Sequence, residues 1–302
     1  MRVPFLQATF VPVILGTVIA WQVTKAFDLG LFLLTLLGAS LIQIATNMFN
    51  DYFDFKSGND LQVRHHNPFA GGGRILTAGL ISRSTHLLVA TACLVLGALI
   101  GLYFVIALQL TALFWLGLIG VISAYSYVGP PFRFAYRGVG EFVVGLNFGP
   151  VMTLGAYYAQ AGSLSLVPFL ASIPIGMLIA AVLWINEFPD IDADRAVGKR
   201  TLMLRLGYSR SVTVYIGLIA VSYLLVVIYS LLQLFASLTI TSYATLAVLL
   251  TIPVAARAVK VLKTNYKDPH AIIPANAGTI MLHLTFGILS VLGFVIGGLA
   301  GL

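Results

Sequence analysis

The sequence predicts an all-α integral membrane protein, and three observations carry this prediction. Only 9% of its 302 residues are charged and its mean hydropathy is +0.99, whereas about a quarter of the residues of a soluble domain are charged. Apolar runs of roughly 20 residues, the length of a helix that crosses a bilayer, recur along the whole chain. The alternation of apolar and polar residues that marks the strands of a membrane barrel is absent, so we expect helices.

Nine apolar stretches are long enough to form transmembrane helices. Their expected ranges are 5–24, 30–50, 84–106, 109–128, 139–161, 165–187, 211–234, 239–260 and 279–301. The first stretch is not expected to be a cleavable signal peptide, because only Arg2 precedes it and no cleavage site of small residues follows it. The one cysteine, Cys93, falls inside the third stretch, so a disulfide framework is excluded.

The basic residues predict how the bundle is oriented in the membrane. Of the 17 Lys and Arg residues, all but Lys25 fall on one side when the nine stretches cross the bilayer in turn. The positive-inside rule makes that side cytoplasmic. We therefore expect a multi-pass protein of the cell (plasma) membrane, with the N-terminus and the polar loops in the cytoplasm and the C-terminus outside. A nucleic-acid partner would need a soluble basic domain, which the sequence lacks.

The chain is expected to form a single domain over residues 1–302. Two cytoplasmic connections, about 51–83 and 188–210, are long and polar, and each follows an even-numbered stretch and opens with a group of acids. This spacing suggests two pseudo-equivalent halves, helices one to four and five to eight, with a ninth helix added. The outside loops are short and are interpreted as plain connectors.

The first group of acids lies in "NMFNDYFDFKSGND", residues 47–60, and the second in "NEFPDIDADRAVGKRTL", residues 186–202. Asn50 and Asp54 are four residues apart, so they share one face of a helix. Asn186, Asp190 and Asp194 follow one another at the same spacing. Two such sets of oxygen donors facing each other suit Mg²⁺, which prefers oxygen ligands and keeps waters or substrate phosphates.

The second group also contains a helix breaker. Pro189 is expected to break or kink the sixth helix and so to open its backbone toward the site. Acids near helix ends are commonly ordinary solvated loop residues. Two matching groups on one side of the membrane, each followed by cations, favour a metal site instead.

Cations among metal-binding acids are what a Mg²⁺–diphosphate requires, because Arg and Lys neutralise the phosphate charge that the metal does not. The candidates are Arg74, Arg133 and Lys199 with Arg200, and the alternative for each is a positive-inside anchor. The glycines of "AGGGR", 70–74, could cradle phosphate with backbone N–H groups or form a flexible lid. Glu141 could cap a loop or act as a base near the substrate.

Two other classes of membrane protein use buried or paired carboxylates. An ion-coupled transporter would place its acids at mid-membrane on broken helices, whereas here they lie at one face among cations. A CDP-alcohol phosphotransferase would need one contiguous D-G-x-x-A-R…G…D-x-x-x-D run, and the chain has no such run. Both readings are disfavoured on these grounds.

The two acidic motifs together resemble those of the UbiA-type membrane prenyltransferases. The match comprises an N-D-x-x-D motif, here Asn50, Asp51 and Asp54, and a D-x-x-x-D motif, here Asp190 and Asp194. The stretches "GGGRILTAG" and "YVGPPFRFAYRGVGE" look most like the MenA branch, which prenylates 1,4-dihydroxy-2-naphthoate on the way to menaquinone. The family often carries a further acid where this chain has Gly58, and Asp60 is expected to compensate for its absence.

The resemblance implies a nine-helix bundle around a central cavity with a polar cap on the cytoplasmic side. It implies Mg²⁺ as the cofactor, held on an isoprenyl diphosphate by the catalytic residues Asn50, Asp54, Asp190 and Asp194. Further support for the metal would come from Asp51, Asp60 and Asn186, and the diphosphate would be bound by Arg74, Lys199, Arg133 and Tyr127.

The implied reaction is transfer of an isoprenyl group from a polyprenyl diphosphate to an aromatic acceptor. The partners are these two substrates and the lipid bilayer, and no obligatory protein partner is inferred. The acceptor could instead be another quinone precursor or a glycerol phosphate of an ether lipid. A carbocation needs a dry, aromatic-lined chamber. Candidate wall residues, for which ordinary packing or an interfacial belt is the alternative, are Tyr125, Tyr127, Phe132, Tyr157, Tyr158 and Trp184.

Overall fold

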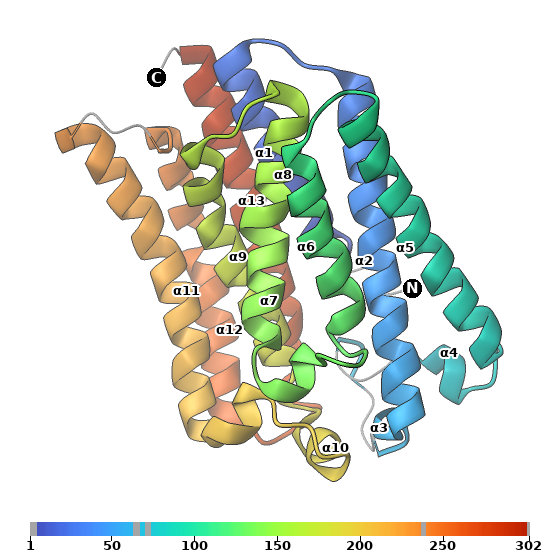
Figure 1. Ribbon diagram of the computed structural model, residues 1–302. Helices are drawn as coiled ribbons and strands as arrows, with labels where there is room; N and C mark the ends of the chain where they lie inside the picture. The colour runs from blue at the N-terminus through green and yellow to red at the C-terminus, as the bar shows by residue number, and fades with distance from the viewer. Residues whose placement is uncertain (1–4, 63–66, 70–73, 237–239, 301–302) are drawn as a thin grey trace.

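The computed structural model describes residues 5–62, 67–69, 74–236 and 240–300, and this part of the chain is helical with no strand (Figure 1). The α-helices are α1 (Gln7–Thr24), α2 (Leu29–Ser57), α3 (Asn59–Gln62), α4 (Arg74–Thr77), α5 (Arg83–Ile106), α6 (Ala112–Ser126), α7 (Gly140–Leu146), α8 (Met152–Ala161), α9 (Leu166–Asn186), α10 (Ile191–Ala196), α11 (Leu202–Ala236), α12 (Ile252–Asn265) and α13 (Ile273–Ala300). Two 3₁₀ helices, η2 (Phe134–Arg137) and η4 (Tyr243–Thr251), and one π-helix, η3 (Asn147–Val151), complete the helical elements of the described residues. The predicted all-α fold is confirmed.

The membrane-crossing segments lie where the apolar runs predict them. Eight described helical segments are long and apolar enough to span a bilayer, and the apolar helix α6 is shorter than these. The segment Gly140–Ala161 is counted as one span made of α7, η3 and α8, and Tyr243–Asn265 as another made of η4 and α12. The predicted count of nine spans is therefore not confirmed, although a helix or helical segment occupies each of the nine predicted stretches.

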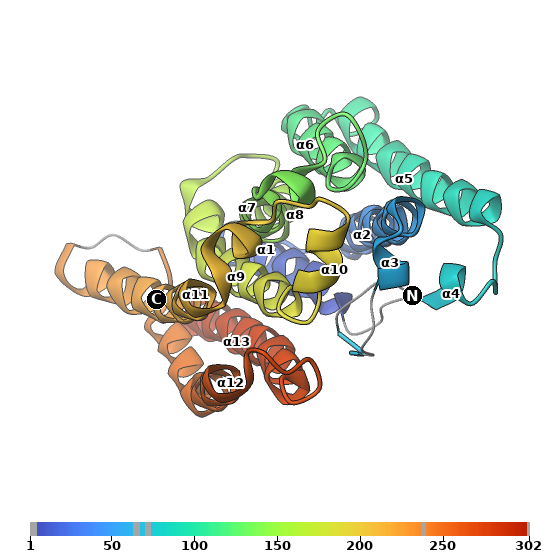
Figure 2. The ribbon, with the colours of Figure 1, turned by 90° about the horizontal axis from the view of Figure 1, so that it is seen from below.

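Helices α1 and α9 form the centre of the bundle. In each of them 61% of the apolar window is buried, against 17% in α2 and in α5, which lie at the edge. Seen from the polar end, α1 and α9 lie between the α5–α6 side and the α11–α13 side (Figure 2). Helix α1 packs mainly on α8 and α13, and α9 packs on α7, α11 and α13. The division into two four-helix halves stays a prediction.

Irregular turns interrupt several spans. A π-helical turn, η3, contains Pro150 and joins α7 to α8. Because proline has no N–H, Pro150 cannot donate the regular hydrogen bond of an α-helix. The single π-helical turn accommodates this break within the span. Helix α11 changes direction at Gly207, whose φ of 75° favours glycine. Helix α9 ends at Asn186, just before Pro189, so the predicted break is confirmed.

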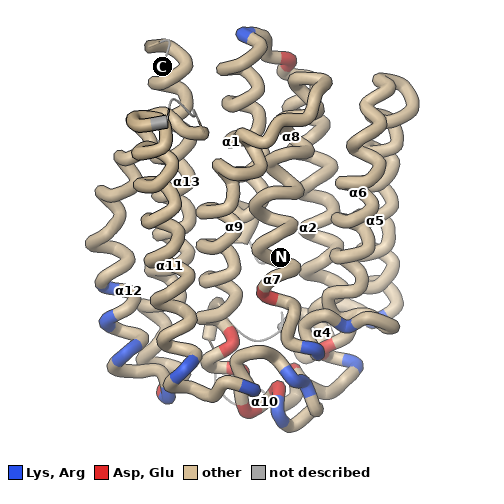
Figure 3. Tube along the Cα trace, turned by 60° about the vertical axis from the view of Figure 1, so that its left-hand side comes forward, with Lys and Arg blue, Asp and Glu red and all other residues tan. Residues whose placement is uncertain are grey.

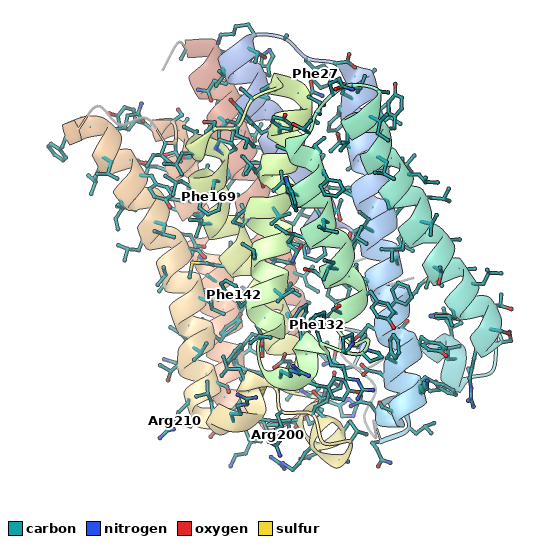
Figure 4. All side chains as sticks on the ribbon, in the orientation of Figure 1. Phe27, Phe132, Phe142, Phe169, Arg200 and Arg210 are labelled. Carbon is teal, nitrogen blue, oxygen red and sulfur yellow. The ribbon has the colours of Figure 1, made fainter. Side chains whose placement is uncertain are left out.

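Charged residues gather at one end of the bundle. Figure 3 shows most Lys, Arg, Asp and Glu residues at the end that carries α4, α10 and the lower part of α12, with few at the opposite end. Arg200 and Arg210 project from this polar end, whereas Phe142, with 73% of its surface exposed, lies on the side of the bundle (Figure 4). The predicted polar cap is confirmed, and it brings the ends of α2 and α9 together.

Candidate active site

A pocket opens beside the polar cap and receives residues from both acidic motifs. Its space, including the open mouth, is about 1080 Å³. The residues predicted for the site that line it are Asn50, Asp54, Tyr127, Asn186, Asp190, Asp194 and Lys199. The first motif is on α2 and the second follows α9, more than 130 residues later, so the fold joins two distant segments. The predicted central cavity is thereby located.

Lys199 links the two motifs. Its Nζ lies 3.0 Å from Asp54 Oδ1 and 3.0 Å from Asp194 Oδ1, and all three side chains are at least nine-tenths buried. The two carboxylate oxygens are therefore at most twice that distance apart. The backbone N–H of Lys199 also donates to the carbonyl of Asp194, at 3.0 Å, which fixes the loop after α10. One cation thus holds both carboxylates at the pocket wall.

The protonation of Lys199 follows from this geometry. Burial by itself lowers the pKa of the Lys199 ammonium, but the negative charges of Asp54 and Asp194 outweigh it, and the pKa is raised well above its usual value. Lys199 therefore stays charged across the physiological range. Its Nζ also lies 5.2 Å from the centre of the Tyr136 ring, within reach of a cation–π contact.

Helix α2 ends at Ser57, and Gly58 caps it. This cap stands where the sequence analysis noted a missing acid. Gly58 has φ 82°, the left-handed conformation that glycine adopts at a helix C-terminus without steric cost. Asn59 follows it and is buried, and its Nδ2 donates to Asp194 Oδ1 at 2.8 Å. At Gly58, where the resemblance leads one to expect an acid, the chain forms a turn that directs the Asn59 amide toward the second motif.

The pocket offers oxygen donors for a metal. Among the described residues, no group of three or more His, Cys, Asp or Glu side chains could hold a metal alone. The wall nevertheless contains three residues with carboxylates, Asp54, Asp190 and Asp194, and two with amide oxygens, Asn50 and Asn186. Mg²⁺ takes such donors and completes its coordination with water or substrate phosphates. The donor set fits a Mg²⁺–diphosphate better than a metal bound by protein alone.

Some predicted residues lie elsewhere. Asp51 is buried on α2, and Asp60 is on α3, but neither lines the pocket, so their support of a metal stays a prediction. Arg133 is exposed, and its guanidinium carbon lies 5.6 Å from the centre of the Tyr136 ring, on the ring that Lys199 also approaches. The side chain of Arg74 and the residues 70–73 lie outside the described part of the chain.

Of the candidate wall aromatics, only Tyr127 lines the pocket. Trp184 is in the core, where its Nε1 donates to the Ser211 carbonyl at 2.9 Å. Phe132 is exposed and stacks on Phe134, with ring centres 5.8 Å apart, near the polar end (Figure 4). Ordinary packing or an interfacial position accounts for these two residues.

Three residues that sequence reasoning missed contribute to the site. Asn59 binds Asp194, as described above. Asn276, fully buried on α13, donates through Nδ2 to Asn186 Oδ1 at 2.8 Å and to the Ile185 carbonyl at 3.1 Å, and so fixes the end of α9. Glu187 lines the pocket, where burial and then the charge of Glu141 raise its pKa well above the usual value. Asn276 lies in the first turn of α13, just before the predicted apolar stretch 279–301, so the apolar pattern gave no signal for it.

These features define a multi-pass membrane protein with a deep polar pocket at one end of its bundle. The profile of the UbiA prenyltransferase family matches residues 9–273. The chain belongs to the UbiA prenyltransferase family and is a membrane-embedded prenyltransferase.

Similar proteins agree with this assignment. The 1,4-dihydroxy-2-naphthoate octaprenyltransferase of Bacillus subtilis (strain 168) is 35% identical over 297 residues, which cover 96% of this chain and 89% of that protein. The 2-carboxy-1,4-naphthoquinone phytyltransferase of Synechocystis sp. is 28% identical over 306 residues, which cover 100% of this chain and 92% of that protein.

Solved structures share the fold. The apo structure of a UbiA homolog from Aeropyrum pernix K1 has a TM-score of 0.68 at 18% identity, covering 95% of this chain and 97% of that one. A UbiA homolog from Archaeoglobus fulgidus bound to DMAPP and Mg²⁺ has a TM-score of 0.60 at 17% identity, covering 96% of each chain.

Proposed function

We propose that this protein transfers an isoprenyl group from a polyprenyl diphosphate to 1,4-dihydroxy-2-naphthoate in menaquinone biosynthesis, in a reaction that depends on Mg²⁺. The observation that carries the proposal is the approach of Asp54 and Asp194 to the single ammonium of Lys199 at the wall of one pocket. Carboxylates and a cation side by side are what a metal-bound diphosphate requires. The homolog bound to DMAPP and Mg²⁺ supports the choice of metal and of donor.

The residues of the chain are proposed to act in two ways. Asn50, Asp54, Asp190 and Asp194 would hold Mg²⁺, which when bound stabilises the negative charge of the departing diphosphate. Lys199 would exchange its contacts with Asp54 and Asp194 for diphosphate oxygens when substrate and metal enter. The apolar walls below this layer would exclude water from the reacting carbon.

The bond changes balance without a further reactant. The allylic C–O bond breaks, and the diphosphate leaves with the electron pair. The resulting carbocation accepts an electron pair from an electron-rich ring carbon of the acceptor. From the carboxylic acid form of the acceptor, loss of CO₂ and one proton then restores aromaticity, whereas from the carboxylate form only CO₂ is lost. The names of the relatives from Bacillus subtilis and Synechocystis, both of which act on naphthoate-type acceptors, support this acceptor over a glycerol phosphate.

The test is an assay of membranes that contain the protein, with labelled prenyl diphosphates and a panel of aromatic and glycerol-phosphate acceptors. We expect product with 1,4-dihydroxy-2-naphthoate in the presence of Mg²⁺ and none after chelation with EDTA. The substitutions Asp54→Asn and Asp194→Asn should each lower kcat/KM by roughly 100-fold or more, the loss expected when a charge-stabilising group is removed.

Asp192→Asn is the matched control. Asp192 belongs to the same acidic stretch, but 86% of its side chain is exposed, it pairs with Arg195 at 3.2 Å, and it does not line the pocket. This variant should keep wild-type activity. Full activity in both pocket variants, or equal losses in all three, would contradict the proposed site. If product formed only with a different acceptor, the proposed acceptor would be wrong, but the proposed site would still hold.

A further inference from the structure

A second cavity adjoins the polar pocket. It contains about 1000 Å³ of space, including its open side, between α2, α5, α6 and the α7–α8 segment. The residues that line both spaces are Gln43, Thr46, Tyr127, Val144 and Phe148. Because they share these walls, the second cavity is a continuation of the candidate active site.

The second cavity runs along the bundle axis. On α2 its lining extends from Leu34 to Thr46, and on the α6 side from Leu113 to Tyr127. At about 1.5 Å per helical residue, these stretches correspond to roughly 18–21 Å. Since Leu34 and Leu113 lie near the ends of their helices opposite the polar cap, the cavity crosses most of the apolar layer.

The chemistry of this lining suits a hydrocarbon chain. Most lining side chains are apolar, and several polar ones already have hydrogen-bond partners within the protein. Thr46 Oγ1 donates to the Ile42 carbonyl at 2.8 Å, and Asn147 Nδ2 to the Val143 carbonyl at 2.8 Å. The side chain of Gln43 is bonded to Thr9 and to the Phe5 carbonyl. These three side chains already form hydrogen bonds within the protein, so they do not require a polar ligand in the cavity.

Glycines open the middle of the cavity. Gly117 and Gly120 on α6 line it, and a Cβ atom added to either would meet no other atom within 4 Å. The glycines at the α2–α5 contact are different, because a Cβ at Gly97 would lie 2.8 Å from Ile42 Cγ1. Gly97 therefore serves close helix packing, whereas Gly117 and Gly120 leave space that nothing in the protein fills.

With the donor tail in this cavity, as the proposed function requires, we propose that Gly120 and Gly117 determine the length of isoprenoid tail that the enzyme accepts. The proposal rests on the proposed function, because the tail must be attached to a diphosphate in the polar pocket. Gly120 is seven residues from Tyr127 and Gly117 is ten. These separations correspond to roughly 10 and 15 Å along the helix. A side chain at position 120 would therefore obstruct a tail nearer its head than one at position 117.

The test compares Gly120→Leu and Gly117→Leu with the wild type, using prenyl diphosphates of increasing chain length and one acceptor. Both variants should fold, since the added Cβ meets no atom and leucine favours helix more than glycine does. We expect kcat/KM for the shortest donor to stay within about twofold of the wild type. For long donors it should fall at least tenfold, and the cut-off length should be shorter for Gly120→Leu than for Gly117→Leu.

Gly217→Leu is the matched control, because Gly217 lies on α11, has no atom within 4 Å of an added Cβ and lines neither cavity. It should leave the length profile unchanged. An unchanged profile in both α6 variants would overturn the assignment of Gly117 and Gly120 as length determinants, while wild-type transfer would still uphold the proposed function. If kcat/KM for the shortest donor also fell, the substitutions would be acting at the reaction centre, and this result too would overturn the proposal. Absence of transfer by the wild type with every donor would instead be a failure of the proposed function.

Discussion

At the scale of single residues, the site depends on Lys199. Buried carboxylates near hydrocarbon are costly when they are unpaired. In this structure one ammonium stands 3.0 Å from an oxygen of Asp54 and of Asp194. Because the pKa of Lys199 is raised, its stabilising contribution is fully present at neutral pH and is lost only as the pH rises through that raised value. Lys199 thus keeps the two motifs together in this structure.

The first prediction at this scale concerns Lys199→Met. Without metal, the substitution leaves two buried carboxylates without their cation, and we expect a loss of about 3–5 kcal/mol in the free energy of unfolding. Mg²⁺ should recover part of this loss, since a ligand that binds only the folded state stabilises it. Thermal unfolding of the purified protein in detergent, with EDTA and with Mg²⁺, measures both effects.

Arg200→Met serves as the control for that experiment, because Arg200 is the next residue and its side chain is exposed. It should unfold within about 0.5 kcal/mol of the wild type, as exposed substitutions usually do. Equal stability of Lys199→Met and the wild type in EDTA would show that the buried ion pairs do not hold the motifs together. A Mg²⁺ response no larger than that of the wild type would argue against a metal between the carboxylates.

At the scale of elements, the contact of α9 with α7 and η3 positions the second motif. Gly176 on α9 faces Gly145 and Gly149, and a Cβ at Gly176 would lie 2.5 Å from the Gly145 carbonyl oxygen. Small residues let helix backbones approach closely within a membrane. Since α9 ends at Asn186, just before Asp190, this close contact also sets the position of the pocket wall.

Gly176→Ala is therefore expected to destabilise the protein by about 1–3 kcal/mol, the cost of forcing extra volume into a packed interior. Gly217→Ala, with open space around its Cβ, should be neutral or stabilising by up to about 1 kcal/mol because alanine favours helix. The two apparent melting temperatures in detergent make the comparison. A melting temperature for Gly176→Ala equal to or above that of the control would refute the packing argument.

At the scale of the whole molecule, most charged residues lie at one end of the helix bundle (Figure 3). The polar cap carries the site, whereas Figure 3 shows few charged residues at the opposite end. Lys25 and Asp28 lie in the connection between α1 and α2, and Lys25 Nζ donates to the Gly298 carbonyl at 2.9 Å. The positive-inside rule then predicts that the pocket opens to the cytoplasm.

This orientation can be tested by labelling single cysteines in a Cys93→Ser background. Ser163 is exposed in the connection between α8 and α9, and Lys267 is exposed between α12 and α13 at the polar end. In intact cells, a membrane-impermeant maleimide should label the Ser163→Cys variant and not the Lys267→Cys variant. Both should react after permeabilisation. The reverse pattern would place the pocket outside and contradict the predicted topology.

The sequence by itself determined the features that depend on local spacing. Apolar run lengths predicted where helices lie, because the bilayer fixes the length that must be spanned. The i, i+4 spacing predicted that Asn50 and Asp54 share a face, and both line the pocket. Pro189 predicted the end of α9, since proline cannot continue the hydrogen-bond ladder. Charge asymmetry along the chain predicted a polar cap at one end.

Only the tertiary structure decided which distant groups meet. Lys199 was one of several candidate cations, and its contact with both Asp54 and Asp194 depends on how α2 approaches α10. Asn59 and Asn276 gained their roles from helix ends and packing that no periodicity encodes. The open space beside Gly117 and Gly120 depends on how α6 is placed against its neighbouring helices, because no atom lies within 4 Å of a Cβ added to either glycine. Sequence spacing constrains only neighbours along one helix, whereas these contacts depend on the relative positions of different helices.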